Sequence, residues 1–183
     1  MTATLLSMLG ALLCALLARA DVMPQSDFQL QRMAGKWYLI GFATNAHWFV
    51  SKKSEMKMGT AVFVPTAGGD LDMTYTSVNS DGSCWKMTHL AKKTDIPGRF
   101  TFRSQRWSND NDMRVVSIKY DEYALIHTIK TKGGVSEVLN KMYSRSTDLS
   151  PELMQKFEQF SKASGVLPEN IVFLAKNGEC PDA

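Results

Sequence analysis

Gly35-Lys36-Trp37-Tyr38-Leu39-Ile40-Gly41-Phe42-Ala43 is the stretch that decides the fold, because it opens a long series of strand-like runs. Gly35 ends a short helical turn that Asp27 is expected to cap and that reaches Met33. Residues 37–43 then read as the first strand, rich in aromatic and aliphatic side chains. Seven more such runs follow, over residues 59–65, 71–78, 84–91, 99–105, 113–119, 123–130 and 136–143.

Turn residues separate these runs at hairpin spacing. Gly, Asn, Asp, Ser and Pro gather at residues 66–70, 79–82, 96–98, 108–112 and 132–134. Eight short strands joined in this way predict either a sandwich or an up-and-down barrel.

The end of the chain has a different pattern, which predicts one helix. Ser150 offers an N-cap, Pro151 suits the first helical position, and Gly165 can end the helix. Residues 171–174 read as a short final strand. Between them, one apolar stripe is formed by Leu153, Met154, Phe157 and Phe160. An eight-strand run followed by one amphipathic helix fits an all-β fold, an eight-stranded up-and-down antiparallel barrel with one C-terminal α-helix packed on its wall.

The first twenty residues read as a secretory signal peptide. Residues 5–17 form an apolar core, and Ala18-Arg19-Ala20 is a small-residue cleavage site. We expect residues 21–183 to form a single secreted domain. No later stretch is long and apolar enough to span a membrane.

Charge and cysteine content narrow the function further. The formal net charge is only +3, which argues against nucleic acid as a partner. The pairs Lys52-Lys53 and Lys92-Lys93 read either as solvated loops or as a mouth that attracts acidic lipids. If Cys14 leaves with the leader, Cys84 and Cys180 are the two thiols that remain, and a disulfide between them is predicted.

The combination of Gly35-x-Trp37, the cysteine pair and Tyr143-Ser144-Arg145 resembles the lipocalin family over the whole mature chain. The resemblance implies an eight-stranded calyx barrel in which Arg145 stacks on Trp37 and closes one end. One family motif departs: Ile118-Lys119-Tyr120 stands where lipocalins carry Thr-Asp-Tyr, which puts any interaction of that Asp in doubt.

Within the family, the chain resembles the branch of lipocalin-type prostaglandin D synthases. The resemblance is carried by residues 43–45, Trp48, 52–53, 100–107, 123–125 and 171–174. Those enzymes attack their substrate with a cysteine thiolate, and the matching residue here is Gly59. Of the positions matching the helper hydroxyls, Leu39, Ala61 and Tyr75, only Tyr75 carries one. No thiol-dependent enzyme activity is therefore expected.

Alternation along each strand predicts which side chains face the lumen. If Trp37 points inward, so do Leu39, Gly41 and Ala43, while Gly59 is inward by the resemblance. Phe100, Ser104, Val115, Ser117, Ala124 and Thr128 share the inward parity on later strands. The expected ligand-binding residues are Leu39, Gly59, Ala61, Phe63, Met73, Tyr75, Met87, His89, Phe102, Trp107, Met113, Ile126, Leu139, Lys141 and Tyr143.

This mostly apolar wall predicts a small hydrophobic ligand such as a retinoid, with retinoic acid as one example, or a fatty acid. Lys141 either meets a ligand carboxylate, pairs with Glu137, or faces water if the register differs. Trp48 and Trp107 either stack on a ligand ring near the opening or cover loop surface. We expect a monomer that needs no cofactor or metal, with a cell-surface receptor as a further candidate partner.

Two rival functions stay open on the same fold. One is an isomerase with an unrecognised base, such as Tyr75 or His89, or a scavenger of reactive species. The other is protein–protein signalling through the loops at the open end. A siderophore site of the neutrophil-lipocalin type is disfavoured, because its three basic positions match His89, Lys130 and Leu139.

Overall fold

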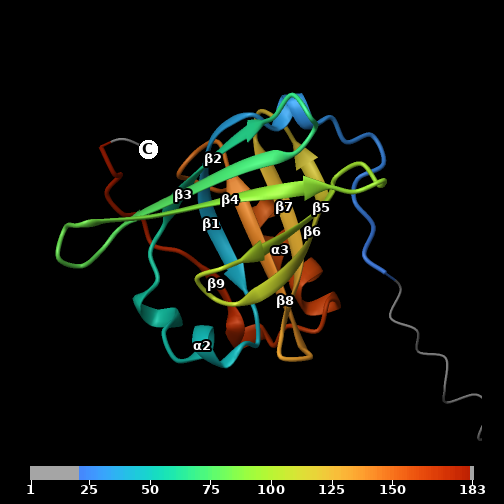
Figure 1. Ribbon diagram of the computed structural model, residues 1–183. Coiled ribbons are helices and arrows are strands. Elements are labelled where there is room, and N and C mark those ends of the chain that lie inside the picture. Colours follow the sequence, from blue (N-terminus) through green and yellow to red (C-terminus); the bar gives the residue numbers. More distant parts are fainter. Residues whose placement is uncertain (1–20, 182–183) are drawn as a thin grey trace, which may run out of the picture.

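Eight antiparallel strands close into a barrel in the computed structural model, which describes residues 21–181 (Figure 1). Consecutive strands pair from β2 to β8, and β1 pairs with both β2 and β8, which closes the barrel. The expected fold class is confirmed. The expected leader, residues 1–20, lies outside the described residues. The strands are β1 (Gly35–Ala43), β2 (Gly59–Pro65), β3 (Leu71–Val78), β4 (Cys84–Lys93), β5 (Arg99–Ser104), β6 (Asn109–Lys119), β7 (Tyr123–Lys132) and β8 (Val135–Ser144).

The barrel is packed solid at one end. Trp37, Phe63, Met73 and Tyr143 have no exposed surface and belong to one apolar cluster inside the barrel. Met33, from the 3₁₀ turn η1 (Leu30–Met33), joins this cluster. This turn is shorter than expected, because it begins at Leu30. Its N-cap residue is Gln29, which makes no side-chain capping bond, so the expected cap by Asp27 is wrong.

Two β-bulges reverse the inward parity of their strands. The register between β1 and β8 shifts between Leu39 and Gly41, so Gly41 and Ala43 face outward and Phe42 lies opposite Lys141. The register between β6 and β7 shifts between Val115 and Ser117. The expectation that Gly41, Ala43 and Ser117 face the lumen is therefore wrong, since an extra residue exchanges the two faces beyond it.

The helix α3 (Pro151–Ala163) packs on the outside of the barrel wall. Ser150 caps it by accepting a hydrogen bond from the Leu153 amide at 3.3 Å. Phe157 fills the interface: a Cβ at Gly41 would stand only 2.7 Å from its ring. The strand β9 (Ile171–Phe173) then pairs with β1 beside the helix. Both the helix and the final strand agree with the sequence.

Three further short helical elements lie in the connections: α2 (His47–Val50), η2 (Lys53–Glu55) and η3 (Pro168–Asn170). Phe49 of α2 is fully buried and stacks on Phe42, with ring centroids 5.0 Å apart. These elements were not expected from the sequence. None of the helices in residues 21–181 has the length and apolar character needed to cross a bilayer.

Strand β6 begins earlier than expected, at Asn109. The polar residues 109–112 were expected in a turn, but they pair with β5 from Asn109 to Asp112. The Arg99 guanidinium donates to both carboxylate oxygens of Asp112, at 3.0 and 2.8 Å, which holds this charged segment in the ladder.

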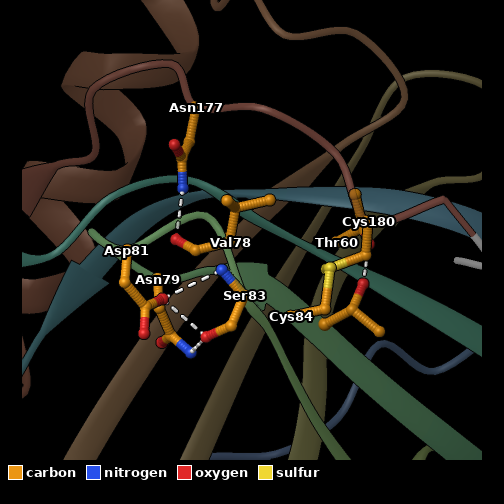
Figure 2. Close-up of a disulfide and its surroundings, with 9 residues drawn as sticks. Thr60, Val78, Asn79, Asp81, Ser83, Cys84, Asn177 and Cys180 are labelled. Atoms are coloured by element: carbon orange, nitrogen blue, oxygen red, sulfur yellow. Dashed lines mark hydrogen bonds between the residues drawn. A yellow bond between two sulfur atoms is a disulfide. The ribbon is translucent and has the colours of Figure 1, made fainter.

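The segment after β9 is fastened to the β3–β4 hairpin, which extends beyond the other strands in Figure 1. Cys180 is disulfide-bonded to Cys84, the first residue of β4, as the cysteine count predicted. Asn177 reinforces the attachment by donating to the Val78 carbonyl at 2.9 Å (Figure 2). The bond closes a loop with a sequence separation of 96 residues, and chain-entropy arguments give such a loop about 4.7 kcal/mol of stabilisation.

Candidate ligand-binding cavity

A cavity lies inside the barrel, beyond the packed end that contains Trp37, and the strands from β3 to β8 line it. Its free volume is about 50 Å³. Pockets that hold lipid-sized molecules have volumes of about 300–1,000 Å³, so this lumen is much smaller than the sequence suggested. The lining residues are Tyr75, Met87, His89, Phe102, Ser104, Trp107, Asn111, Met113, Ile126, Thr128, Lys130, Leu139, Lys141 and Tyr143.

A row of aromatic rings accounts for the small volume. Tyr75 lies 6.3 Å from His89, and His89 lies 4.9 Å from Phe102 between ring centroids. These rings come from β3, β4 and β5 and reach across the lumen from neighbouring strands. A bulky guest therefore requires one or more of them to change rotamer.

Lys141 faces this cavity from β8. Its ammonium nitrogen lies 4.8 Å from the centre of the Tyr75 ring, and no ion pair or hydrogen bond holds it within residues 21–181. Burial, with a smaller effect from the positive charge of Lys130, lowers the pKa of Lys141 to about 7. The pKa of Lys130 is lowered by burial too, although Glu137 opposes this effect. The surroundings therefore favour either the binding of an anion beside Lys141 or the neutral form of the Lys141 amine.

The cavity also contains two neighbouring phenol hydroxyls, those of Tyr75 and Tyr143. Tyr143 is fully buried, and its hydroxyl makes no hydrogen bond of good geometry in the described part of the chain. The neighbouring Tyr75 hydroxyl donates instead to the sulfur of Met73 at 3.3 Å. Burial raises the pKa of Tyr75 to about 12 and the pKa of Tyr143 well above its usual value. Both phenols stay protonated and can donate to a ligand.

The opposite end of the barrel is sealed by Trp37 and Arg145. The Trp37 indole donates to the Met33 carbonyl at 2.9 Å. The Arg145 guanidinium lies over the Trp37 ring and donates to the carbonyls of Lys36, Ala34 and Tyr120 at 2.7, 2.8 and 3.0 Å. These bonds join η1, β1 and the β6–β7 turn, so this end offers no entrance to a ligand.

Most of the residues expected from the sequence meet at the cavity, but five do not. Ala61, Phe63 and Met73 lie in the packed end with no exposed surface, and Leu39 packs between two apolar clusters. Gly59 is at the start of β2 and does not line the cavity. Those that do line it are Tyr75, Met87, His89, Phe102, Trp107, Met113, Ile126, Leu139, Lys141 and Tyr143.

Two lining residues, Asn111 and Lys130, were missing from the expected inward set. Asn111 fell in a polar run that resembled a turn. Lys130 has the same parity as Ile126 and Thr128 on β7, and this alternation could have placed it on the inner face.

His89, which also lines the cavity, has a lowered pKa, caused first by burial and then by the charges of Lys141 and Lys130.

Gly59 has no room for a side chain. A Cβ built on it would stand 2.6 Å from the Thr76 carbonyl oxygen of β3 and 3.3 Å from the Ser77 Cβ. Because the nearest atom belongs to the backbone, a side chain here requires two paired strands to move apart.

Residues 21–181 contain two cysteines, and both are in the disulfide. No group of three His, Cys, Asp or Glu side chains suited to a metal is found in the same residues.

The closed eight-stranded barrel, the helix on its wall, the sealed end and the internal cavity define a calyx-type barrel. The chain belongs to the lipocalin family: residues 34–178 match the Lipocalin / cytosolic fatty-acid binding protein family. A protein named Lipocalin from Rhinella marina is 45% identical over 168 residues, covering 92% of this chain and 91% of the relative.

Two other relatives show how varied similar proteins are. The Prostaglandin-H2 D-isomerase of Canis lupus familiaris is 36% identical over 177 residues, covering 96% of this chain and 91% of the relative. Among solved structures, one described as "The Siderocalin Ex-FABP functions through dual ligand specificities" matches with a TM-score of 0.70 and 26% identity. It covers 81% of this chain and 99% of the other. The similarity to the prostaglandin D synthase branch seen in the sequence is thus confirmed.

Proposed function

We propose that this protein is a secreted carrier that binds a small hydrophobic molecule in the barrel cavity. The observation that carries the proposal is the cavity itself, whose wall combines aromatic and aliphatic side chains with polar ones and contains Lys141 without a counter-ion in residues 21–181. Lipocalins bind small hydrophobic ligands, and polar groups placed among apolar side chains orient such a ligand. Acidic lipids and retinoids with a carboxylate are the favoured class, because their charge complements Lys141 and Lys130.

The ligand enters by displacing the aromatic row. Phe102 and His89 are only partly buried, and Trp107 at the edge of the cavity is 47% exposed. Rotamer changes of such side chains are fast and cost little compared with the apolar area that a lipid buries. Arg106 lies 5.3 Å from the Trp107 ring and 5.7 Å from the Trp85 ring, so these groups form a movable edge to the cavity.

Binding is tested by quenching of tryptophan fluorescence during titration with all-trans retinoic acid, retinol, thyroid hormone and oleate. Saturable quenching by retinoic acid and weaker quenching after Lys141→Met support the proposal. Quenching by none of the four ligands, with the protein folded by circular dichroism, contradicts it. An unchanged affinity for retinoic acid in Lys141→Met removes Lys141 as the group that orients the ligand.

We propose further that the carrier has no prostaglandin D synthase activity of the thiol-dependent type. The support is chemical: both cysteines of residues 21–181 are in the disulfide, and Gly59 has no side chain that could act as a nucleophile. Incubation with prostaglandin H2 should give product at the spontaneous rate. Conversion well above that rate, sensitive to a thiol-blocking reagent, would refute this.

A further inference from the structure

We propose that Lys141 captures hydrophobic aldehydes covalently, as a reversible imine inside the barrel. This inference rests on the proposed function, because the aldehyde must first enter the apolar cavity. It goes beyond simple carriage, since it assigns a bond-forming residue and a ligand class, the apolar aldehyde.

The position of Lys141 favours a reaction at its nitrogen. It lies between Phe42 of β1 and Ile126 of β7 in the strand register, with its ammonium group directed over the Tyr75 ring. Titratable groups that line the cavity around it are Tyr75 of β3, His89 of β4, Lys130 of β7 and Tyr143 of β8. None of these groups is a carboxylic acid, so no carboxylate in the lining stabilises the protonated form of Lys141.

The same surroundings supply the reactive form of the amine. Burial and the nearby Lys130 lower the pKa of Lys141 to about 7, so a large share of the side chain is neutral at physiological pH. An ordinary surface lysine has a pKa of about 10.4 and is almost wholly protonated there. Even allowing for its lower basicity, Lys141 should react at least about tenfold faster than a surface lysine at pH 7.4.

The reaction needs no co-reactant. The neutral Lys141 nitrogen adds to the aldehyde carbon, and a proton moves from nitrogen to oxygen to give a carbinolamine. Loss of the hydroxyl as water then forms the carbon–nitrogen double bond, so one aldehyde and one amine give one imine and one water. The Tyr143 hydroxyl, which has no partner of good geometry in residues 21–181, can donate to the ligand oxygen during this step.

The test uses all-trans retinal and its alcohol, retinol, which has a similar shape but cannot form an imine. The intact protein is incubated with retinal at pH 7.4, reduced with cyanoborohydride, and analysed by mass spectrometry of the whole protein and of its peptides. We expect one reduced adduct per chain, mapped to Lys141. It should be absent in Lys141→Met and Lys141→Arg, and unchanged in the control Lys86→Met, which alters an exposed lysine of β4.

A pH series makes the result independent of the variants. The rate of trapping at Lys141 in the wild-type chain should rise with a midpoint near pH 7, whereas labelling of surface lysines should still be rising at pH 9. Retinol binding, measured by tryptophan quenching, separates the two proposals. If retinol binds but retinal labels Lys141 no faster than the surface lysines, aldehyde capture is wrong and the carrier function stands. If neither retinal nor retinol binds but retinoic acid does, aldehyde capture is wrong and the carrier function stands. If retinoic acid, thyroid hormone and oleate fail to bind as well, both proposals are overturned.

Discussion

The guanidinium carbon of Arg145 lies 3.6 Å from the centre of the Trp37 ring, and Trp37 has no exposed surface. A cation over an indole contributes about 1–2 kcal/mol when partly desolvated, and the three carbonyls that Arg145 binds add to this. The pair holds together parts of the chain that are 108 residues apart in sequence, since it joins the first strand to the end of the last barrel strand.

Arg145→Met should therefore lower the free energy of unfolding by about 1–3 kcal/mol, because the stacking on Trp37 is lost and two part-buried carbonyls and one exposed carbonyl lose their donor. Urea unfolding monitored by tryptophan fluorescence measures this. Arg103→Met is the matched control, since Arg103 forms an exposed pair with Asp110 and should cost under about 1 kcal/mol. Equal losses in the two variants would show that Arg145 has no special role at the sealed end.

Gly59→Ala should destabilise the fold by about 1–3 kcal/mol, because its new methyl group overlaps the Thr76 carbonyl. Gly68→Ala is the control. A Cβ at Gly68 meets no atom closer than 3.9 Å, and that substitution should change stability little. Thermal unfolding of the two variants gives the comparison. A Gly59→Ala protein as stable as the wild type would mean that this strand start can accept a side chain.

Phe102→Ala should strengthen retinol binding severalfold, because it removes one ring of the row that fills the cavity. Phe160→Ala is the control, since Phe160 packs on the outer side of the barrel against His127, with ring centroids 5.8 Å apart. Tryptophan quenching gives both dissociation constants. Weaker or unchanged binding in Phe102→Ala would indicate that the ring contacts the ligand instead of blocking it.

Stability should rise between pH 7 and pH 9 in part because of Lys141. Its folded-state pKa of about 7 lies below the ordinary 10.5, so the unfolded chain binds more protons across this range. Lys141 therefore opposes folding most strongly below pH 7, and this opposition decreases as the pH rises from 7 toward 10.5. Lys141→Met should be more stable than the wild type at pH 7 and should gain about 1–2 kcal/mol less on going to pH 9.

Urea unfolding of both proteins at the two pH values measures this difference. The pH range stops at 9 because above this pH the titration of the buried tyrosines also changes the free energy of unfolding. Parallel pH dependence in the two proteins would place Lys141 in water. Lys86→Met again serves as a control for loss of a surface charge.

The alternation of apolar residues placed most of the residues that line the cavity from β4, β5 and β8 on the inner face. It works there because the strands are regular, so every second residue faces inward. Lys141 and Tyr143 on β8 follow this rule, and both line the cavity. The rule fails on β1 beyond Leu39, where a bulge sends Gly41 outward under Phe157.

The sequence by itself determined the eight strands, the capped helix and the disulfide, because each depends on local periodicity, turn residues or the number of thiols. The choice of a barrel over a sandwich came from the family resemblance. Tertiary structure decided the rest: where the bulges exchange the two faces, that Asn109–Asp112 is strand, and how little room the rings leave. Tyr75, His89 and Phe102 come from three different strands. How their rings share one lumen depends on packing across the barrel, which no local pattern in the chain records.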